Sequence, residues 1–270
     1  MIEVKNIKKS FGGKPVIQDV SCIMKAGQCN LIIGSSGSGK TVLQKCMVGL
    51  FEPDEGHVLY NGQDFTAMKG EHKTAIRKEI GMLFQGAALF DSLTVQENVM
   101  FPLSMFTSNS FKKKLDRVNE VLARVNIADA NKKYPSELSG GMKKRVALAR
   151  AIVLNPKYLF CDEPNSGLDP QTALVIDKLI KEITLEYKMT TVINTHDMNS
   201  VMEIGDYILY MYQGQKEWEG NNKEIIFSKN ERLNSFIFAS EFLQDAKDMR
   251  MLEETGQIPH HRTLGKESKL

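Results

Sequence analysis

The sequence predicts an α/β protein with a parallel sheet, organised around a phosphate-binding loop. Short apolar runs alternate with segments of helical periodicity, which is typical of strands separated by helices. One apolar run ends in a carboxylate pair, Asp162-Glu163. Another leads into a glycine-rich stretch that fits the pattern G-x-x-x-x-G-K-[ST], namely Gly34, Ser35, Ser36, Gly37, Ser38, Gly39, Lys40 and Thr41.

The context of the glycine-rich stretch supports a phosphate loop over a flexible Gly/Ser turn. The apolar run 31–33 reads as a buried strand, and apolar residues at helical spacing follow from 42 to 50. Glycines let backbone N–H groups turn around an anion, and the next helix adds its positive dipole end. Lys40 can then reach the β- and γ-phosphates, and the Thr41 hydroxyl can ligate Mg²⁺. We therefore predict that the chain binds a nucleoside triphosphate.

The amino-terminal region reads as an antiparallel β unit. Strands are expected at 2–7 and 16–24 with the turn Gly12-Gly13 between them, and a further strand at 56–60. We expect residues 1–33 and 56–60 to wrap around the start of the nucleotide core. Phe11 precedes the first turn, and its local pattern fits a surface-anchored core residue and a stacking face for a nucleotide base equally well.

The middle of the chain is predicted to be mainly helical. Residues 64–79 are polar and predict a short helix with loops, and the strand 80–84 ends at Gln85. From about 87 to 155 we expect a short helix at 95–100, a helix with apolar spacing from 115 to 125, and a long helix after Ser139-Gly140-Gly141. The lysine-rich clusters predict a solvated face, with a face near anionic lipid headgroups as the alternative: 112–114, 132–133 and 143–145.

The last third returns to β/α alternation. Strands are expected at 158–161, 190–194 and 207–211, the last being the final core strand, with an amphipathic helix over 174–183. Two short helices are expected within 222–239, and the composition of 259–270 predicts a mobile end.

Bulk composition excludes several classes of protein. The 35 basic and 33 acidic residues give a net charge of +2, which provides no case for nucleic-acid binding. The sequence has no apolar run long enough to span a membrane, and its first residues alternate like a strand rather than a signal peptide. The cysteines are widely spaced, which predicts buried thiols in a reducing cytoplasm: Cys22, Cys29, Cys46 and Cys161.

The carboxylate pair predicts hydrolytic chemistry. In parallel sheets ligands bind at the carboxyl ends of strands, where Asp162 would hold Mg²⁺ directly or through water. Glu163 would orient and deprotonate the attacking water, a contribution typically of ~10²–10⁴-fold. Alone, such a pair more often opens a turn before a proline; downstream of a phosphate loop the catalytic interpretation is favoured.

Several further motifs resemble those of ATP-binding-cassette (ABC) ATPases, in family order over residues 2–220. Leu138-Ser139-Gly140-Gly141-Met142 is similar to the signature motif, although the commonest form has Gln in place of Met142. Gln85 matches the Q-loop, Ser166-Gly167-Leu168-Asp169 the D-loop and His196 the switch histidine, and Phe11 falls at the base-stacking position.

The resemblance implies a P-loop NTPase fold of ABC-ATPase type. Its RecA-like core would carry an antiparallel β subdomain and an α-helical signature subdomain. An ATPase domain would span 1–240, with the helical subdomain at about 87–155, followed by a C-terminal extension at 241–270.

The resemblance also implies a mechanism with ATP and Mg²⁺ as cofactors. Two ATP molecules would be sandwiched in a head-to-tail dimer with a second copy (a homodimer) or a homologue, with Ser139, Gly140 and Gly141 contacting the partner's γ-phosphate. Asp169 would contribute to nucleotide binding, and His196 would stabilise the transition state. Gln85 would sense Mg²⁺ and water and pass closure to a membrane permease. The ATPase would then lie peripherally on the cytoplasmic side of the inner membrane.

The stretch from Gly81 to Leu103 is similar to the Mla-type branch, whose ATPases drive phospholipid movement with a permease and an MCE lipid-binding subunit. Small regulatory subunits also occur there, and the tail from Glu241 could contact one or be disordered. The alternatives are the ATPase of another ABC importer or exporter, and a soluble ABC ATPase acting on ribosomes or DNA. A single cassette, the lack of a long coiled-coil insertion and the near-zero net charge disfavour the soluble class.

Overall fold

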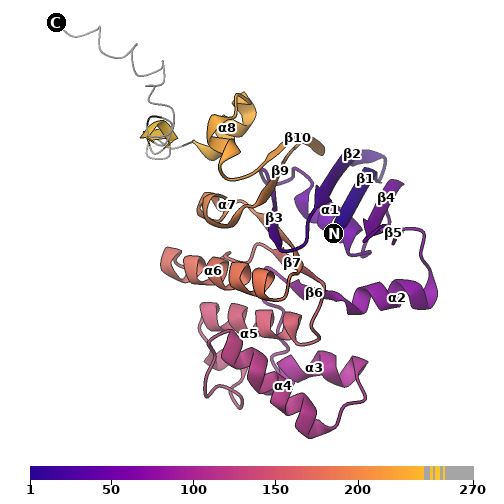
Figure 1. Cartoon of the computed structure of the whole chain (residues 1–270), viewed down its shortest axis with the longest axis vertical. Coiled ribbons are helices and arrows are strands. Elements are labelled where there is room, and N and C mark those ends of the chain that lie inside the picture. The colour runs from indigo at the N-terminus through magenta and orange to yellow at the C-terminus, as the bar shows by residue number, and fades with distance from the viewer. Residues whose placement is uncertain (240–243, 246, 250–251, 253–270) are drawn as a thin grey trace, which may run out of the picture.

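Two β-sheets lie next to each other, with a group of helices at the opposite end of the molecule (Figure 1). The computed structural model describes residues 1–239, 244–245, 247–249 and 252. The larger sheet has six strands in the order β10-β9-β3-β8-β7-β6, and the smaller has four in the order β2-β1-β4-β5. The predicted α/β class is confirmed.

The larger sheet aligns the strand ends that carry the sequence motifs. It contains β3 (Gln28–Ile33), β6 (Ile80–Leu83), β7 (Tyr158–Asp162), β8 (Thr190–Thr195), β9 (Tyr207–Tyr212) and β10 (Gln215–Gly220). All its pairs are parallel except β9 with β10. Ile33 is in register with Thr195, and Asp162 with Asn194. The carboxyl ends of β3, β7 and β8 therefore meet at one edge of the sheet.

One sequence prediction about the sheets was wrong, and one edge strand was missed. β3 was expected in the antiparallel unit but lies inside the parallel sheet, paired with β8 and β9. Its residues are buried on both faces, which is typical of a central parallel strand. The strand 207–211 is the last core strand, as predicted, but nothing in the sequence indicated β10, an edge strand that follows it; most residues of β10 are polar and none is buried.

The smaller sheet is antiparallel, as predicted, and its first two strands are longer than predicted. It consists of β1 (Ile2–Phe11), β2 (Lys14–Met24), β4 (Glu55–Tyr60) and β5 (Gln63–Asp64). The helix α1 (Lys40–Met47) packs its buried Leu43 and Met47 into the same core as Ile32 and Val58. The phosphate loop at the start of α1 is thus supported by both sheets.

The helical end of the molecule contains α3 (Val95–Phe106), α4 (Phe111–Arg124), the short η1 (Pro135–Glu137) and α5 (Gly140–Ile152) (Figure 1). A separate helix, α2 (Gly70–Lys78), precedes β6. The short helix predicted at 95–100 is wrong in length, since α3 continues through Pro102. Thr94 and Glu97 form a capping box at its start, and the buried Val99 and Leu103 hold it against the core.

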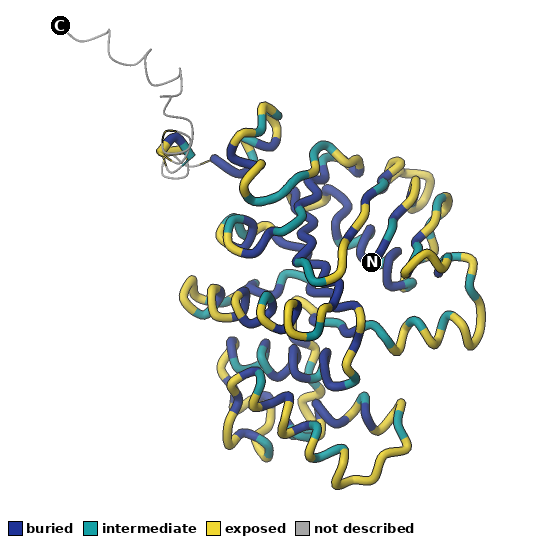
Figure 2. The backbone as a smooth tube through the Cα atoms, in the orientation of Figure 1, coloured by how far each residue is buried: buried dark blue, intermediate teal, exposed yellow. Residues whose placement is uncertain are grey.

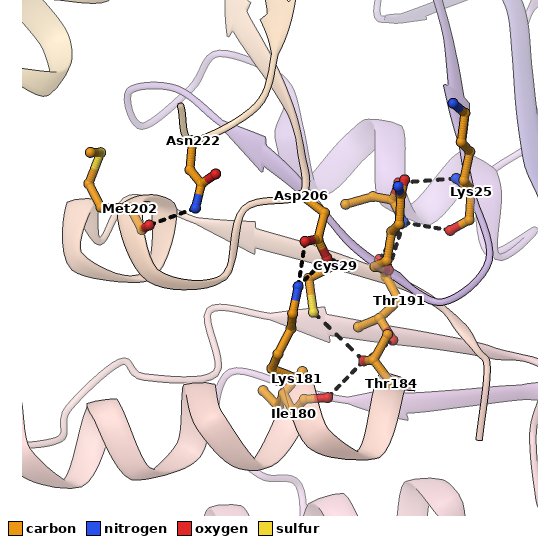
Figure 3. Close-up of polar contacts among 11 residues, drawn as sticks. Lys25, Cys29, Ile180, Lys181, Thr184, Thr191, Met202, Asp206 and Asn222 are labelled. Atoms are coloured by element: carbon orange, nitrogen blue, oxygen red, sulfur yellow. Dashed lines mark hydrogen bonds and ion pairs between the residues drawn. The ribbon is translucent and has the colours of Figure 1, made fainter. Parts of the chain in front are cut away.

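The carboxyl-terminal helices flank the larger sheet: α6 (Pro170–Glu186), α7 (Met198–Ile204), the 3₁₀ turn η2 (Glu224–Phe227) and α8 (Glu231–Ile237). Figure 3 shows how α6 is joined to the sheet. Lys181 forms an ion pair with Asp206, and Thr184 bonds Thr191 Oγ1 at 2.7 Å. Burial raises the pKa of Cys29, which lies against Thr184, to about 12.

The burial pattern agrees with the predicted core (Figure 2). Dark-blue residues fill the central strands, and exposed residues follow the outer helix faces. All four cysteines are buried free thiols, and burial also raises the pKa of Cys22 to about 12. Within the described residues, none of the helices has the length and apolar character needed to cross a bilayer. The mobile end predicted at 259–270 lies outside the described residues.

Candidate active site

The glycine-rich loop leads from β3 into α1 in a backbone shape that only glycine allows at two positions. Gly34 has a φ of 149°, and a Cβ there would lie 2.3 Å from the carbonyl oxygen of Met211. Gly39 has a φ of 103°, and its Cβ would lie 2.7 Å from Ile17 Cδ1. The loop can therefore pass close to both β9 and β2 only without side chains at these positions.

Lys40, the first residue of α1, is buried with 8% of its surface exposed. Its Nζ donates to the carbonyl oxygens of Gly34 at 2.6 Å and Ser35 at 3.1 Å. Burial lowers the pKa of Lys40, while the carboxylates of Glu163 and Asp162 oppose that shift. The ammonium thus lies at the loop, between the helix start and the acidic strand end.

The acidic strand end is held by the neighbouring strand β8. Asn194 Nδ2 donates to Asp162 Oδ1 at 3.2 Å, and the Glu163 backbone N–H donates to the Asn194 carbonyl at 2.9 Å. Glu163 has a φ of 48°, a left-handed conformation that is strained for a residue with a side chain. Its carboxylate Oε2 lies 2.8 Å from His196 Nδ1, so two predicted catalytic residues are in direct contact.

Gln85 and the loop after Glu163 are joined by Lys144. Gln85 Nε2 donates to Ser166 Oγ at 3.3 Å. Lys144 Nζ donates to the carbonyl oxygen of Gln85 and, at 3.2 Å, to that of Glu163. Lys144 was expected in a solvated cluster, but only 5% of it is exposed and burial lowers its pKa. The prediction failed because α5 turns this lysine inward, toward loop carbonyls that have no local sequence signal.

One cavity of about 610 Å³ collects most of the predicted residues. It is lined by phosphate-loop residues together with Gln85, Asp162, Glu163 and His196. The phosphate-loop residues that line it are Ser35, Ser36, Gly37, Gly39, Lys40 and Thr41, along with Val42. Val16 and Phe236 also line it, and sequence analysis missed both, because an apolar residue on a strand or a short helix has no pattern that marks a ligand wall.

The signature residues lie apart from this cavity. Ser139 caps α5 by accepting a hydrogen bond from the Met142 N–H at 3.3 Å, and it is exposed. A Cβ on Gly141 would lie 2.5 Å from Thr172 Cγ2, so the start of α5 packs closely on α6. Asp169 caps α6, and its hydrogen bonds with the Thr172 side chain and backbone lower its pKa. Ser139, Gly140 and Asp169 are exposed, Gly141 is buried between the two helices, and none of the four lines the cavity at the phosphate loop.

Phe11 also lies outside the cavity lining. Its side chain is 44% exposed and packs edge-on against Phe51, with ring centroids 5.3 Å apart. The ammonium of Lys9 lies 5.5 Å from the same ring centroid. The structure therefore does not bring Phe11 together with the other site residues, and base stacking by Phe11 stays a prediction.

The donor set fits a magnesium–triphosphate ligand. The hydroxyl of Thr41, the amide of Gln85 and the carboxylate of Asp162 supply the hard oxygen ligands that Mg²⁺ prefers. Among the described residues no group of three or more His, Cys, Asp or Glu could hold a metal alone. Mg²⁺ is usually bound by one or two carboxylates together with substrate phosphates, and Asp162 would supply one carboxylate here.

Comparisons with known proteins agree with this geometry. Residues 17–166 match the protein family described as "ABC transporter". The chain is 39% identical over 261 residues to the methionine import ATP-binding protein MetN of Campylobacter jejuni, covering 91% of the chain and 78% of the relative. It is 36% identical over 236 residues to the probable ribonucleotide transport ATP-binding protein mkl of Mycobacterium leprae, covering 87% and 68% respectively.

Solved structures of ABC cassettes are also similar to this chain. The dimeric bacterial ABC transporter cassette MJ0796 is 32% identical, with a TM-score of 0.75 over 82% of this chain and 99% of that chain. The same cassette has been solved as a dimer in a post-hydrolysis state with ADP and Pi. cbiO1 from Clostridium perfringens is 28% identical, with a TM-score of 0.79 over 90% of this chain and 98% of that chain. The chain therefore belongs to the ABC transporter family, as an ATP-binding subunit that hydrolyses ATP.

Proposed function

We propose that this ATPase works as a head-to-tail homodimer that drives a membrane permease. The observation that carries the proposal is the division of the site. Lys40, Glu163 and His196 line one cavity, whereas Ser139 lies at the exposed start of α5, apart from it. A helix start is a ready anion site, so a second copy can present Ser139, Gly140 and Gly141 to the triphosphate. The dimeric state of the similar MJ0796 cassette supports this arrangement.

Within each site the residues would have separate roles. Lys40 and the loop from Gly34 to Gly39 would bind the phosphates, and Thr41, Gln85 and Asp162 would hold Mg²⁺, which supplies charge neutralisation when bound. Glu163 would take the proton of the attacking water. His196, 2.8 Å from Glu163, would donate to the oxygens where charge develops.

A second cavity offers a place for the permease. It has a volume of about 300 Å³ and is lined by the aromatic residues Phe84, Phe90, Phe101 and Phe106. All four are at least 39% exposed, and their grouping around one cavity supports an interaction surface. Because Phe84 directly precedes Gln85, a displacement of Gln85 at the nucleotide site would be transmitted to an apolar permease segment bound here. The ATPase would then lie on the cytoplasmic face of the membrane.

For the cargo we propose phospholipid, with MCE lipid-binding and small regulatory subunits as further partners. Support comes from the similarity of residues 81–103 to the Mla-type branch, and from Met142 in the signature, which is compatible with it. The second candidate is an amino-acid importer, favoured by the 39% identity to a methionine import ATPase. Most of the tail from 241, proposed to contact a neighbouring subunit, lies outside the described residues.

The experiment is purification of the tagged full chain from its native membrane after cross-linking. The proposal expects a polytopic permease and bound phospholipid, and ATPase activity of the purified complex that responds to phospholipid vesicles. If the chain is recovered with a permease, and the ATPase activity of that complex responds to methionine and a binding protein, the importer function is supported instead. Recovery with ribosomes or DNA, and no membrane protein, would overturn both candidates.

A further inference from the structure

A buried carboxylate on α6, outside the cavity lining, connects two loops of the active site. Asp177 is 1% exposed. Its Oδ1 accepts from Asn165 Nδ2 at 2.9 Å, and its Oδ2 accepts from Ser200 Oγ at 2.7 Å. Asn165 Nδ2 also donates to Ser200 Oγ at 3.0 Å, which closes a triangle of polar contacts.

Two corners of this triangle belong to the chain segments that carry the catalytic residues. Asn165 follows Glu163 by two positions, and Ser200 follows His196 by four, in the first turn of α7. In front, Glu163 and His196 contact each other directly at 2.8 Å. Away from the cavity, Asp177 accepts a hydrogen bond from each of the two segments. The carboxylate therefore fixes how far one loop lies from the other.

The placement of Asp177 is costly for the fold. Burial raises its pKa to about 6, and the carboxylates of Asp197 and Glu203 add to that shift. The hydrogen bonds from Ser200 and Asn165 oppose it, and Asp177 in turn raises the pKa values of the buried thiols of Cys29 and Cys161. Asn165 Oδ1 is buried without a hydrogen-bond partner. An apolar residue would pack here at lower cost, which favours a role in fixing one arrangement.

We propose that Asp177 is a positioning residue for ATP hydrolysis, holding the Glu163 segment and the His196 segment at the spacing that the reaction needs. It touches neither nucleotide nor metal, because it lies outside the residues that line the cavity. The proposal rests on the roles proposed for Glu163 and His196. Its expected effect is on turnover, with nucleotide binding at the phosphate loop preserved.

The first test is Asp177→Asn in the full chain. The amide has one acceptor oxygen in place of two, so either Asn165 or Ser200 loses its partner. We expect kcat to fall roughly 10-fold, the effect of one lost buried hydrogen bond on a barrier, with KM for ATP within about 2-fold. The matched control is Thr184→Val, on the same helix and equally buried, whose hydrogen bonds reach only Ile180, Thr191 and Cys29 (Figure 3).

The control separates positioning from general destabilisation. The kcat of each variant is measured at the same number of degrees below the melting temperature of that variant. If Thr184→Val lowers kcat as much as Asp177→Asn, or if Asp177→Asn raises KM in proportion to its effect on kcat, the proposal is overturned.

A swap variant tests the geometry itself. Asn165→Asp combined with Asp177→Asn returns a carboxylate that accepts from the amide and from Ser200, with the partners exchanged. We expect the double variant to recover most of the lost kcat, whereas Asn165→Asp alone places two carboxylates together and stays impaired. Failure of the swap to recover activity in a folded, ATP-binding protein would count against the spacing role.

The pH dependence supplies a further readout. Protonation of Asp177 removes one acceptor, so the ratio of wild-type kcat to Asp177→Asn kcat should approach one below about pH 6. Groups shared by both proteins cancel in this ratio. A ratio that stays constant with pH would contradict the proposal. Glu163→Gln is assayed in parallel: brisk hydrolysis by that variant would overturn the proposed role of Glu163, independently of the outcome for Asp177.

Discussion

Nδ1 of His196 lies 2.8 Å from Oε2 of Glu163 across the carboxyl ends of β8 and β7. Two segments separated by more than thirty positions in the chain thus place a carboxylate and an imidazole in contact at one cavity. The contact also orients the imidazole, because the carboxylate bonds one of its two ring nitrogens.

Glu163→Gln should keep ATP binding and remove turnover. The amide cannot accept the proton of the attacking water, so we expect hydrolysis to fall by at least about 10²-fold. The nucleotide-loaded variant should accumulate as a dimer, measured by size-exclusion chromatography with ATP and Mg²⁺. Glu182→Gln, a surface carboxylate paired with Arg124, serves as the matched control and should retain wild-type hydrolysis.

Lys40→Ala should weaken nucleotide binding. The variant removes the ammonium at the phosphate loop, and we expect ATP affinity to fall roughly 10-fold or more, in line with the loss of a charge-assisted contact of about 1.5–3 kcal/mol. Fluorescent-nucleotide titration measures it. Lys112→Ala, at an exposed lysine of α4, is the control, and equal affinity of Lys40→Ala and this control would contradict the assignment.

Ser139→Arg should spare ATP binding and block dimer closure. Ser139 is exposed at the start of α5, so the larger side chain fits the monomer but would meet the partner's triphosphate in the proposed dimer. We expect near-complete loss of ATP hydrolysis with unchanged nucleotide affinity in the titration. Ser104→Arg, exposed on α3, is the matched surface substitution. Normal turnover of Ser139→Arg would argue against a site completed by a second copy.

Lys144→Met should uncouple Gln85 from Glu163. The thioether fills the same space but leaves both partly buried loop carbonyls without their donor, at a cost below the roughly 1–3 kcal/mol of a fully buried acceptor. We expect lower kcat and a lower melting temperature, with Lys144→Arg retaining more of both. Unchanged activity of Lys144→Met would mean that the two loops hold their positions without it.

Stability should depend on pH through Asp177. Its pKa is raised from 3.8 to about 6, so the stability it contributes is complete below about pH 3.8 and is lost as pH rises through about 6. Asp177→Asn does not ionise. The melting temperature of the variant relative to wild type should therefore rise between about pH 4.5 and 7.5, as measured by thermal unfolding in this range. A constant or falling difference would contradict the raised pKa.

The sequence predicted the phosphate loop and the Asp162-Glu163 strand end well, because each is a local pattern whose context is also local. It failed for the length of α3, which was expected at 95–100 and continues to Phe106, where the buried Leu103 packs against the core. It failed for β10, whose polar residues match an edge strand as well as a loop.

Contacts between distant segments could not be read from the sequence. Lys144 belongs to a basic cluster, and only the direction of α5 shows that its ammonium meets the carbonyls of Gln85 and Glu163. Asp177 lies on an amphipathic helix between apolar positions, and its partners come from other segments of the chain. Periodicity indicates which face is inward; it does not indicate what that face contacts.

The burial of every cysteine makes the protein well suited to labelling. Each of the four thiols is at most 5% exposed, and burial raises their pKa values, to about 12 for Cys22 and Cys29 and about 11 for Cys46. Thiolate is the reactive form, so the native thiols should not react with maleimide while the protein stays folded. A reporter cysteine introduced on the surface would then give a signal free of background, and closure of the dimer could be followed in solution without altering any native residue besides the labelled one.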